Sequence, residues 1–542
     1  MSGVSLFGTD GVRGRANLEL TPELALGLAR AAGDGRPGTV VVGRDTRRSG
    51  QMLSAAVHAG FHAAGSDTID LGIVPVGAVS HLTAVRRASY GVMVSASHNP
   101  AEDNGIKFFA PDGAKLGPDR EAAVEARYRH GSPWVEVSGP DIGIQTGMPD
   151  VIEGYLDHLQ GRSRYALHGI DIALDCANGA AFLAAPALFK RLGAEVEAFA
   201  CEPSGTNIND GCGATHPEML AERAKGRVGL AFDGDADRCI AVDEDGATVN
   251  GDVIMAILAN HLHQQGVLPG ELVVATVMSN LGFRLALRGL GIGVVETPVG
   301  DRHVLEEMRR RGAGLGGEQS GHVIFGGEPT GDGLLTGLRL LEVMAATGAP
   351  LKELRRVMRE FPQVLRNVRV RAKERLADAA ALWARVEIME KRLGDQGRVL
   401  VRASGTEPLV RVMVEGEKPL FYGSRCEKFD VDRRAKEKAL FPDHYAEREE
   451  ILLEPYVPSQ PVQSTAPRIG IPRALLFYEL YPFWQAFFQE LGCEVVVSDP
   501  TTKAIIHNGA ERSVAETCFP MKVALGHTLN LLEKEIDYVF LP

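Results

Sequence analysis

Several features that mark secreted, membrane-spanning and nucleic-acid-binding proteins are scarce in this sequence of 542 residues. Its seven cysteines are dispersed and none belongs to a CxxC pair, which argues against a disulfide scaffold and favours reduced thiols in a cytoplasmic protein. No apolar run approaches the roughly 18 residues that span a bilayer, and we expect no signal peptide because basic and apolar leader segments are missing. The formal net charge of -12 argues against nucleic-acid and anionic-membrane partners.

The composition is otherwise that of a soluble globular protein, with 45% apolar and 24% charged residues. The length predicts about three to five domains. Strand-like apolar runs alternate with helical stretches such as 52–65, and these runs end in polar, turn-prone residues: 38–45, 88–96, 169–179, 228–235 and 271–280. This pattern predicts an α/β protein with buried parallel strands, whose chemistry lies just beyond the carboxyl ends of those strands.

The character of the sequence changes after Gly416. Before it, a predicted helix over 377–394 precedes two predicted short strands around a loop in 397–416. After it come a charged stretch over 426–454 and a Pro/Ser/Gln-rich linker over 455–468. A new alternation of strand and helix patterns follows, which predicts a separate and partial α/β segment of Rossmann-like type.

The first segment that can carry chemistry is "SASHNP", which follows a predicted strand. Because Asn99-Pro100 breaks any helix, we expect Ser97 and His98 on a tight, exposed loop. A serine there can carry a phosphoryl group if a base or a metal activates its hydroxyl. The alternative is a plain turn rich in Ser, Asn and Pro.

Three aspartates at alternate positions, Asp233, Asp235 and Asp237, directly follow another predicted strand. Three hard carboxylate oxygens at a strand end suit Mg²⁺ and leave room for a phosphoryl oxygen. An EF-hand loop is one alternative, but Arg238 stands where that loop needs Gly. A solvated acidic turn is the other alternative.

Two further polar segments suit a phosphorylated sugar. In "GGEQSGHVIF", alternating polar groups can bond sugar hydroxyls or an amine, and they are Glu318, Ser320 and His322. In "RASGTEPLVR", backbone N–H groups and two guanidinium groups can hold a phosphate, from Arg402, Ser404, Gly405, Thr406 and Arg411. The alternatives are a glycine-rich loop and an ordinary turn.

Three arginines in "GTDGVRG" and "GRDTRRSG" are additional candidates for phosphate contacts: Arg13, Arg44 and Arg47. Their alternative role is surface ion pairing, which contributes little to stability. Taken together, a serine loop, a tri-aspartate loop, a polar sugar-type loop and a phosphate nest indicate phosphoryl transfer.

These segments, in this order, resemble the α-D-phosphohexomutase superfamily from the amino terminus to about Gly416. "GEQSGH" favours the branch that acts on glucosamine phosphates over the phosphomannomutase/phosphoglucomutase branch, which stays an alternative. The resemblance implies three related α/β domains and a truncated small fourth domain, over 1–150, 151–248, 249–364 and 365–416. The sequence departs from the family pattern over 324–335, and the family's final helix is absent after "RVMVEG".

The resemblance also implies an activity, the interconversion of glucosamine 6-phosphate and glucosamine 1-phosphate on the route to UDP-N-acetylglucosamine. Ser97 would be the phosphoserine, and Mg²⁺ would bind it together with Asp233, Asp235 and Asp237. A sugar 1,6-bisphosphate would be the intermediate and activator. The expected partner is a phosphosugar, and the chain is expected to be cytoplasmic, with a homo-oligomer left open.

Each remaining site residue has an implied role. Glu318 and Ser320 would contact the sugar, and the "RASGT" residues with Arg411 would hold the non-reacting phosphate. A further substrate-facing loop would contain Gly300, Asp301 and Arg302. His98 and Lys107 are candidates for the general acid or base, and Arg238 would assist electrostatically.

Residues 417–542 resemble a fragment of the 2-hydroxyacyl-CoA dehydratase activase family. Gly423 stands where that family's first Cys is expected, so Cys426 is alone and an iron–sulfur role for it is disfavoured. Cys518 is a candidate redox thiol, with a buried structural role as the alternative. Because the junction cuts the fourth domain before its last helix, we hypothesise a chimeric chain rather than a fusion of complete domains. An inactive phosphosugar-binding chain and a redox accessory protein of acyl-CoA dehydratases are the remaining alternatives.

Overall fold

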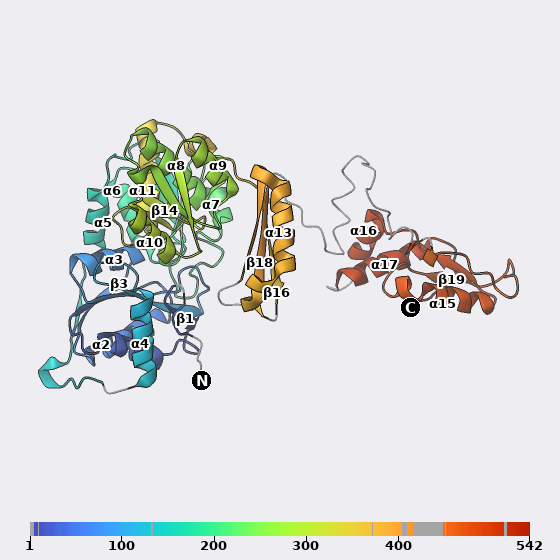
Figure 1. Cartoon of the computed structure of the whole chain (residues 1–542), viewed down its shortest axis with the longest axis horizontal. Coiled ribbons are helices and arrows are strands. Elements are labelled where there is room, and N and C mark those ends of the chain that lie inside the picture. Colours follow the sequence, from blue (N-terminus) through green and yellow to red (C-terminus); the bar gives the residue numbers. More distant parts are fainter. Residues whose placement is uncertain are drawn as a thin grey trace. The chain divides into compact units, whose positions relative to one another are not determined.

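The computed structural model describes residues 5–8, 10–131, 134–370, 372–403, 409–416, 448–449, 451–513 and 518–541. The chain forms two compact units, Met1–Phe421 and Tyr422–Pro542 (Figure 1). Helices alternate with sheets in the described parts of both units, so the predicted α/β class is confirmed.

The first sheet has the strand order β1-β5-β4-β2-β3-β6. Its parallel strands are β2 (Thr39–Arg44), β3 (Asp67–Ile73), β4 (Tyr90–Val94) and β6 (Gln145–Gly147). Antiparallel to their neighbours are β5 (Asp103–Phe109) and β1 (Val12–Arg15). Two faces are covered by helices: α1 (Pro22–Gly33), α2 (Gly50–His62) and α4 (Pro118–His130) on one, and α3 (Val76–Val85) on the other. Covering both faces explains why the predicted strand at 38–45 is a continuous apolar run.

The second and third sheets repeat this design, with strand orders β11-β10-β9-β7-β8 and β13-β12-β14-β15. The second contains β7 (Asp171–Asp175), β8 (Glu195–Phe199), β9 (Val228–Phe232), β10 (Cys239–Val242) and β11 (Thr248–Val249). The third contains β12 (Leu272–Thr276), β13 (Gly293–Thr297), β14 (Leu315–Gly317) and β15 (Val323–Phe325). Their helices are α5 (Val151–Gly161), α6 (Ala181–Arg191), α7 (Pro217–Arg223), α8 (Gly251–Gln264), α9 (Leu281–Gly289), α10 (Asp301–Arg311), α11 (Gly333–Thr347) and α12 (Leu351–Leu354).

In each of the three sheets, the chain reverses direction after one of the parallel strands. In each, one parallel strand is followed by an antiparallel partner, in the pairs β4–β5, β9–β10 and β14–β15. The connecting loops contain the three segments predicted to carry chemistry, at 95–102, 233–238 and 318–322. The polar residues therefore lie at the carboxyl ends of buried strands, as expected.

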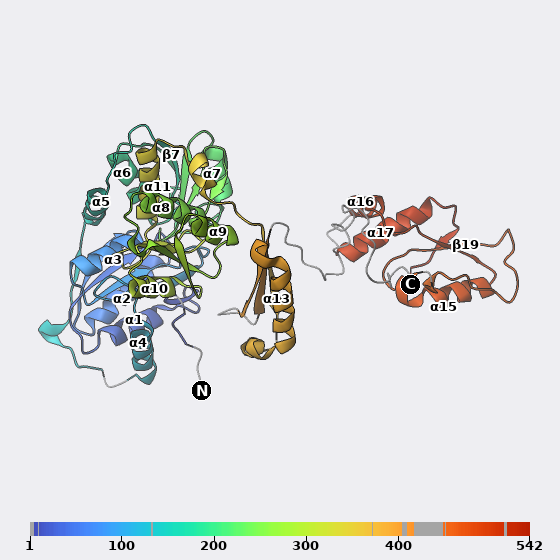
Figure 2. The ribbon, with the colours of Figure 1, turned by 45° about the horizontal axis from the view of Figure 1, so that its top comes forward.

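One hydrophobic cluster runs through the second and third sheets and reaches α3 of the first. The ribbon of these three parts of the first unit is shown in Figure 2. A buried hydrogen bond adds to the cluster, because the hydroxyl of Tyr155 on α5 donates to Asp332 Oδ2 at 2.5 Å. Asp332 also caps α11 by accepting a bond from the backbone N–H of Leu335 at 3.1 Å. These contacts hold the three sheets, and so the three loops, in a common packing arrangement.

The fourth sheet is antiparallel, with β18 (Leu409–Gly416) between β16 (Gln363–Arg369) and β17 (Gly397–Ala403). The predicted helix is α13 (Ala380–Leu393), which packs its Val386 against one face of this sheet. The other face is anchored to the third sheet's loops by Glu415, which is fully buried and accepts a bond from the Leu281 N–H at 2.7 Å. Arg398 Nε donates to Glu415 at 2.5 Å and its Nη1 donates to the Val277 carbonyl at 2.9 Å.

The second unit contains a parallel sheet of order β20-β19-β21. Its strands are β19 (Arg468–Ile471), β20 (Glu494–Val497) and β21 (Tyr538–Val539), and its helices are α15 (Phe477–Glu490), α16 (Lys503–Glu511) and α17 (Phe519–Leu532). The predicted separate α/β segment is therefore confirmed.

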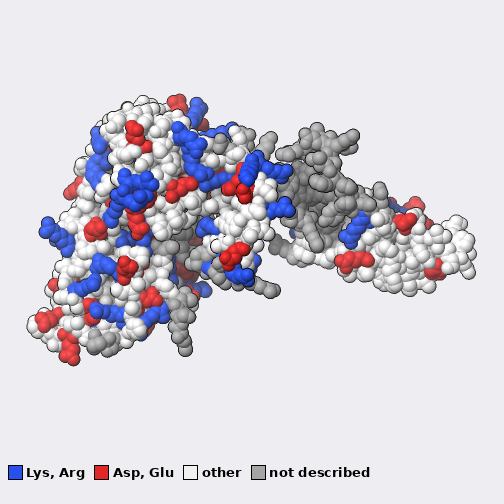
Figure 3. Space-filling model, viewed as in Figure 1, with Lys and Arg blue, Asp and Glu red and all other residues white. Residues whose placement is uncertain are grey.

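Across the described residues, no single helix is long and apolar enough to cross a membrane. Only the pair Gly333–Thr347 and Leu351–Val357, bent by 94°, meets the length and composition required. Basic and acidic side chains are interspersed over the visible face of the first unit (Figure 3).

Asp252, in the first turn of α8, is a buried carboxyl whose ionisation at higher pH lowers the stability of the folded protein. It is 0% exposed and accepts one hydrogen bond, from the Asn280 N–H at 2.7 Å. Burial raises its pKa to about 7, against about 3.9 in an unfolded chain. Between these two values the folded state binds more protons, so stability falls as the pH rises, by about 1.4 kcal/mol per pH unit.

We therefore expect Asp252→Asn to stabilise the protein increasingly between pH 5 and pH 8, since the amide never ionises. Melting temperatures of both proteins at the two pH values measure this effect. Asp119→Asn, an exposed first-turn aspartate of α4, is the matched control and should change neither value. A melting temperature of Asp252→Asn that stays parallel to that of the unsubstituted chain would contradict the expectation.

Candidate active site

The loop after β4 holds Ser97 in a strained, buried position. Its φ of 54° is left-handed, which is costly for a residue with a side chain, and it is only 1% exposed. Its carbonyl accepts bonds from Arg47 Nη2 and Asn209 Nδ2, both at 2.9 Å. These bonds hold the strained loop from the first and second domains together.

A buried brace lies beneath this loop. Arg47 Nε contacts Asp45 Oδ2 at 2.8 Å, and the Ser95 hydroxyl donates to the same oxygen at 2.6 Å. The Ser97 N–H donates to Ser95 Oγ at 2.9 Å. Arg47 was predicted as a phosphate contact, but its guanidinium is occupied by this brace. Arg44 was also predicted as a phosphate contact, and its Nη1 lies 3.5 Å from Asp70 Oδ1 in an ion pair.

The three aspartates lie opposite the Ser97 hydroxyl, in the loop between β9 and β10. Ser97 Oγ donates to Asp233 Oδ2 at 2.5 Å, and one oxygen from each aspartate lies within 4.8 Å of the others. Burial, together with the charges of Asp237 and Asp235, raises the pKa of Asp233 well above its usual value. The Oδ1 atoms of Asp235 and Asp237 are buried without hydrogen-bond partners. Three crowded carboxylates with unsatisfied oxygens fit a hard divalent cation.

Lys107 lies within this acidic cluster. Its Nζ is 2.7 Å from Asp235 Oδ2, 2.9 Å from Asp10 Oδ2 and 3.6 Å from Asp237 Oδ2, and the residue is 1% exposed. Burial favours the neutral amine, but the three carboxylates prevail and raise the pKa of Lys107. A firmly protonated lysine supplies positive charge here and is a poor proton acceptor.

His98 has the opposite character. Burial, then the charges of Arg238 and Arg13, lower its pKa to about 4, so the imidazole is neutral at pH 7. Its Nδ1 lies 3.3 Å from Ser97 Oγ. Arg238 lies beside the triad, and its backbone N–H donates to Asp233 Oδ1 at 3.2 Å.

A charged bridge that was missed in the sequence connects the first and third domains. Lys115 pairs with Asp10 from the first domain and with Asp301 at the start of α10. Asp10 also pairs with Arg13, and His322 Nε2 lies 3.7 Å from Asp301 Oδ2. Asp10 belongs to "GTDGVRG", two glycines around an acid, which was the available sequence signal for it.

The loop at 318–322, together with β14 and β15, forms the third hairpin. It faces the charged bridge across a cleft of 610 Å³. Glu318 Oε1 accepts a bond from the Gly300 N–H at 3.0 Å, and Ser320 Oγ donates to Glu318 Oε2 at 3.4 Å. The cleft is lined by eight of the predicted site residues: Arg13, His98, Asp237, Arg238, Gly300, Asp301, Glu318 and His322. Arg302 does not line it, because its Nη2 contacts Glu121 at 2.7 Å and the Leu116 carbonyl at 2.9 Å.

Two predicted arginines of the fourth sheet are cross-strand neighbours, Arg402 on β17 and Arg411 on β18. Burial and the charge of Arg411 lower the pKa of Arg402, while the charge of Glu318 opposes this shift. The arginine is therefore close enough to the third hairpin to interact with it. Ser404, Gly405 and Thr406, predicted beside these arginines, lie outside the described residues.

Comparison with known proteins agrees with this arrangement. Profiles of the phosphoglucomutase/phosphomannomutase alpha/beta/alpha domains I, II and III and of the C-terminal domain match residues 4–133, 153–246, 250–361 and 365–419. Phosphoglucosamine mutase of Pelotomaculum thermopropionicum is 51% identical over 424 residues, which cover 76% of this chain and 95% of the relative. The chain belongs to the phosphoglucosamine mutase family.

Solved structures of related mutases share the fold. A phosphoglucomutase/phosphomannomutase family protein from Burkholderia thailandensis is 27% identical with a TM-score of 0.66, over 77% of this chain and 94% of that one. N-acetylphosphoglucosamine mutase of Aspergillus fumigatus, in complex with GlcNAc-6P and magnesium, has a TM-score of 0.56 at 19% identity, over 77% and 93% of the two chains. At that identity the second likeness concerns the fold alone.

The carboxyl-terminal part of the mutase chain matches a different family, the CoA enzyme activase uncharacterised domain, over residues 468–542. The predicted activase resemblance is thereby confirmed. Cys518 is exposed at the start of α17, and Cys426 lies outside the described residues. Within the part of the chain that the structure describes, the aspartate triad is the one group of three or more convergent metal-ligand side chains.

Proposed function

We propose that the chain is a phosphoglucosamine mutase, which interconverts glucosamine 6-phosphate and glucosamine 1-phosphate through phosphorylated Ser97. The observation that carries the proposal is the Ser97 hydroxyl at 2.5 Å from the buried triad. A hydroxyl placed against a cation site is equipped to carry a phosphoryl group. The 51% identity to a phosphoglucosamine mutase supports the choice of sugar.

In this proposal phosphorylated Ser97 gives its phosphoryl group to a free sugar hydroxyl. The bond from phosphorus to Ser97 Oγ breaks, a bond to the sugar oxygen forms, and the hydroxyl proton passes to a base. The resulting 1,6-bisphosphate turns around, and its other phosphoryl group returns to Ser97. A sugar 1,6-bisphosphate also serves as the activator that first phosphorylates the serine.

The three aspartates and a phosphoserine oxygen would hold Mg²⁺. The ion would offset negative charge on the transferred phosphoryl oxygens. The Oδ1 atoms of Asp235 and Asp237, which are buried and accept no hydrogen bond, support this assignment. The magnesium complex of the Aspergillus fumigatus enzyme, which has the same fold, is consistent with it.

Side chains of this chain supply the remaining charge and proton chemistry. Lys107, Arg238 and Arg13 surround the reacting oxygens with fixed positive charge, which is the main requirement of phosphoryl transfer. Neutral His98, 3.3 Å from Ser97 Oγ, is the candidate to accept and return the hydroxyl proton.

The sugar would lie against the third hairpin, with its non-reacting phosphate on the fourth domain. Arg402 and Arg411, with Ser404, Gly405 and Thr406, would hold the phosphate. Glu318, Ser320 and His322 would contact the sugar, and the loop of Gly300 and Asp301 would close over it. A carboxylate such as Glu318 attracts the ammonium group that distinguishes glucosamine from glucose and mannose.

Turnover of three hexose phosphates tests the proposal. With Mg²⁺ and glucose 1,6-bisphosphate, we expect kcat/KM for glucosamine 6-phosphate to exceed that for glucose 6-phosphate and mannose 6-phosphate by about tenfold or more, which is about 1.4 kcal/mol. Glu318→Gln should lower kcat/KM for the amino sugar by about tenfold and change the other two less, since the lost interaction is charge-assisted. A folded chain that turns over none of the three substrates would overturn the proposal, and equal losses for all three would remove Glu318 from amine recognition.

A further inference from the structure

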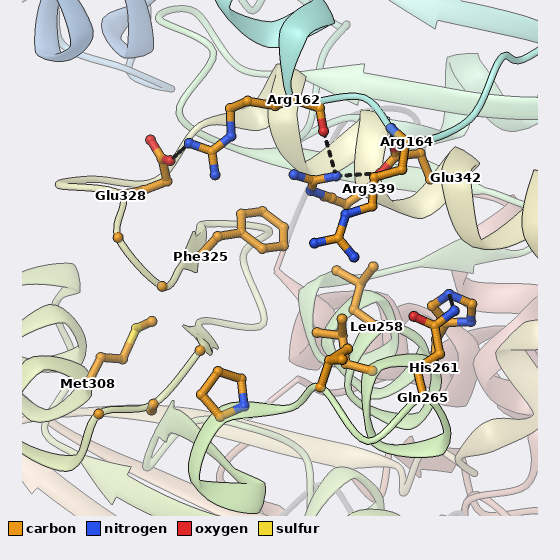
Figure 4. Close-up of a pocket in the computed structure, with 18 of the residues that line it drawn as sticks. Arg162, Arg164, Leu258, His261, Gln265, Met308, Phe325, Glu328, Arg339 and Glu342 are labelled. Atoms are coloured by element: carbon orange, nitrogen blue, oxygen red, sulfur yellow. Dashed lines mark hydrogen bonds and ion pairs between the residues drawn. The ribbon is translucent and has the colours of Figure 1, made fainter. Parts of the chain in front are cut away.

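A second cavity, of 700 Å³, shares no lining residue with the mutase cleft (Figure 4). It is open to solvent on one side and is lined by residues of α8, α10, α11, the loop after β15 and the segment after α5, of which Arg164 is exposed. Its floor is apolar and contains Leu258, Leu262, Leu305, Met308 and Phe325. A concave apolar site of this size is in the range of about 300–1,000 Å³ that small-molecule sites occupy.

Arginines gather at one side of this cavity. Arg162 pairs with Glu328, and Arg339 Nη1 contacts Glu342 Oε2 at 2.6 Å. Figure 4 shows the guanidinium of Arg164 pointing into the cavity between Arg339 and the apolar floor. In the described parts of the chain, Arg164 has no ion-pair partner and its guanidinium has no hydrogen-bond acceptor.

The charge of the lining is suited to an anion. Four arginines, including Arg309, face three carboxylates, so one net positive charge remains. Burial, then the nearby charge of Arg339, lower the pKa of Arg162, while the charge of Asp332 opposes this shift. Basic side chains also gather over α11 on the molecular surface (Figure 3).

We propose that this cavity binds a nucleoside phosphate, with the base on the apolar floor beside Phe325 and the phosphate on Arg164. Guanidinium groups match phosphate oxygens in a bidentate manner. Inorganic phosphate would leave the apolar floor uncovered, and an uncharged aromatic molecule would leave Arg164 unpaired. A nucleoside phosphate satisfies both parts of the lining.

The cavity is connected to the mutase cleft by two elements of the third domain. α10 begins at Asp301 in the cleft and contributes Met308 to the cavity, about 10 Å further along the helix. β15 follows the loop of His322 and ends at Phe325 on the cavity floor. A ligand in the cavity would therefore act on both substrate-facing loops, an inference that rests on the proposed mutase function.

Titration calorimetry of the full chain tests the binding site with ADP, adenosine and pyrophosphate. We expect ADP to bind at one site, and adenosine and pyrophosphate to bind at least about tenfold more weakly. Arg164→Glu should weaken ADP binding by at least about tenfold. Arg36→Glu, which makes the same charge change at an exposed arginine outside the cavity, should leave ADP binding unchanged.

Two outcomes would overturn the site: no heat of ADP binding, or equal ADP affinity in Arg164→Glu, which would place the nucleotide elsewhere. These measurements need no mutase turnover, so failure of the proposed function would leave them interpretable. For the connection, ADP should change the KM for glucosamine 6-phosphate by about threefold or more in the unsubstituted chain and leave it unchanged in Arg164→Glu. An unchanged KM in the unsubstituted chain would refute the connection.

Discussion

Replacing Ser97 with Ala should lower the mutase kcat by at least about 10⁴-fold, which corresponds to about 5.5 kcal/mol of activation free energy. Without the hydroxyl there is no oxygen to carry the phosphoryl group between the two half-reactions. The measurement is the initial rate of glucosamine 1-phosphate formation with Mg²⁺ and glucose 1,6-bisphosphate. Transfer of labelled phosphate from the bisphosphate to the protein should disappear in parallel.

The control for this substitution is Ser66→Ala, which removes another buried hydroxyl of the first domain. Ser66 is 1% exposed and its Oγ has no hydrogen-bond partner among the described residues. We expect Ser66→Ala to retain full activity, and both variants to melt within a few degrees of the unsubstituted chain. Activity of Ser97→Ala within tenfold of normal would reject the phosphoserine mechanism.

The second large effect is expected for Asp235→Asn, which should lower kcat by about 10³-fold at a fixed, low Mg²⁺ concentration. Loss of one of three carboxylates weakens the cation site, and the metal supplies several kcal/mol of charge stabilisation in such reactions. The same variant should require more Mg²⁺ for half-maximal activity. Chelation with EDTA should abolish activity of the unsubstituted chain, and added Mg²⁺ should restore it.

Asp252→Asn is the matched control, since Asp252 is an equally buried aspartate outside the triad. It should show the normal Mg²⁺ requirement while changing thermal stability as described above. If Asp235→Asn has the Mg²⁺ dependence of the unsubstituted chain, the triad is not the metal site. Full activity of the unsubstituted chain in EDTA would lead to the same conclusion.

Much of the fold was predictable because the deciding patterns are local. The apolar runs at 38–45 and 228–235 mark buried parallel strands, and β2 and β9 lie within them. The polar segments directly after such runs mark strand ends, where the sheet geometry brings distant loops together. Ser97 and Asp233 are 136 positions apart, yet alternation of apolar and polar segments placed both at strand ends.

Other features depend on contacts that no local pattern contains. Arg47 looked like a free cation in "GRDTRRSG", but it is used inside the first domain because Asp45 and four carbonyls surround it. The bridge of Asp10, Lys115 and Asp301 forms only when the first and third domains pack together. Single charged residues have no sequence pattern, so partners far along the chain decide their roles.

The fourth sheet is anchored to the third domain at one end and has the Arg402 and Arg411 pair toward its other end. Arg398 and Glu415, which anchor it to the third domain, are paired across β17 and β18, and Arg402 and Arg411 are paired four residues further along the same strands. Side chains two or four positions apart in a strand share a face, so anchor and arginine pair lie on one side, separated by about 13 Å. Any rotation of the sheet about its anchored end would therefore move both guanidinium groups together, and the proposed phosphate site would follow a sugar that presents its phosphate from either end.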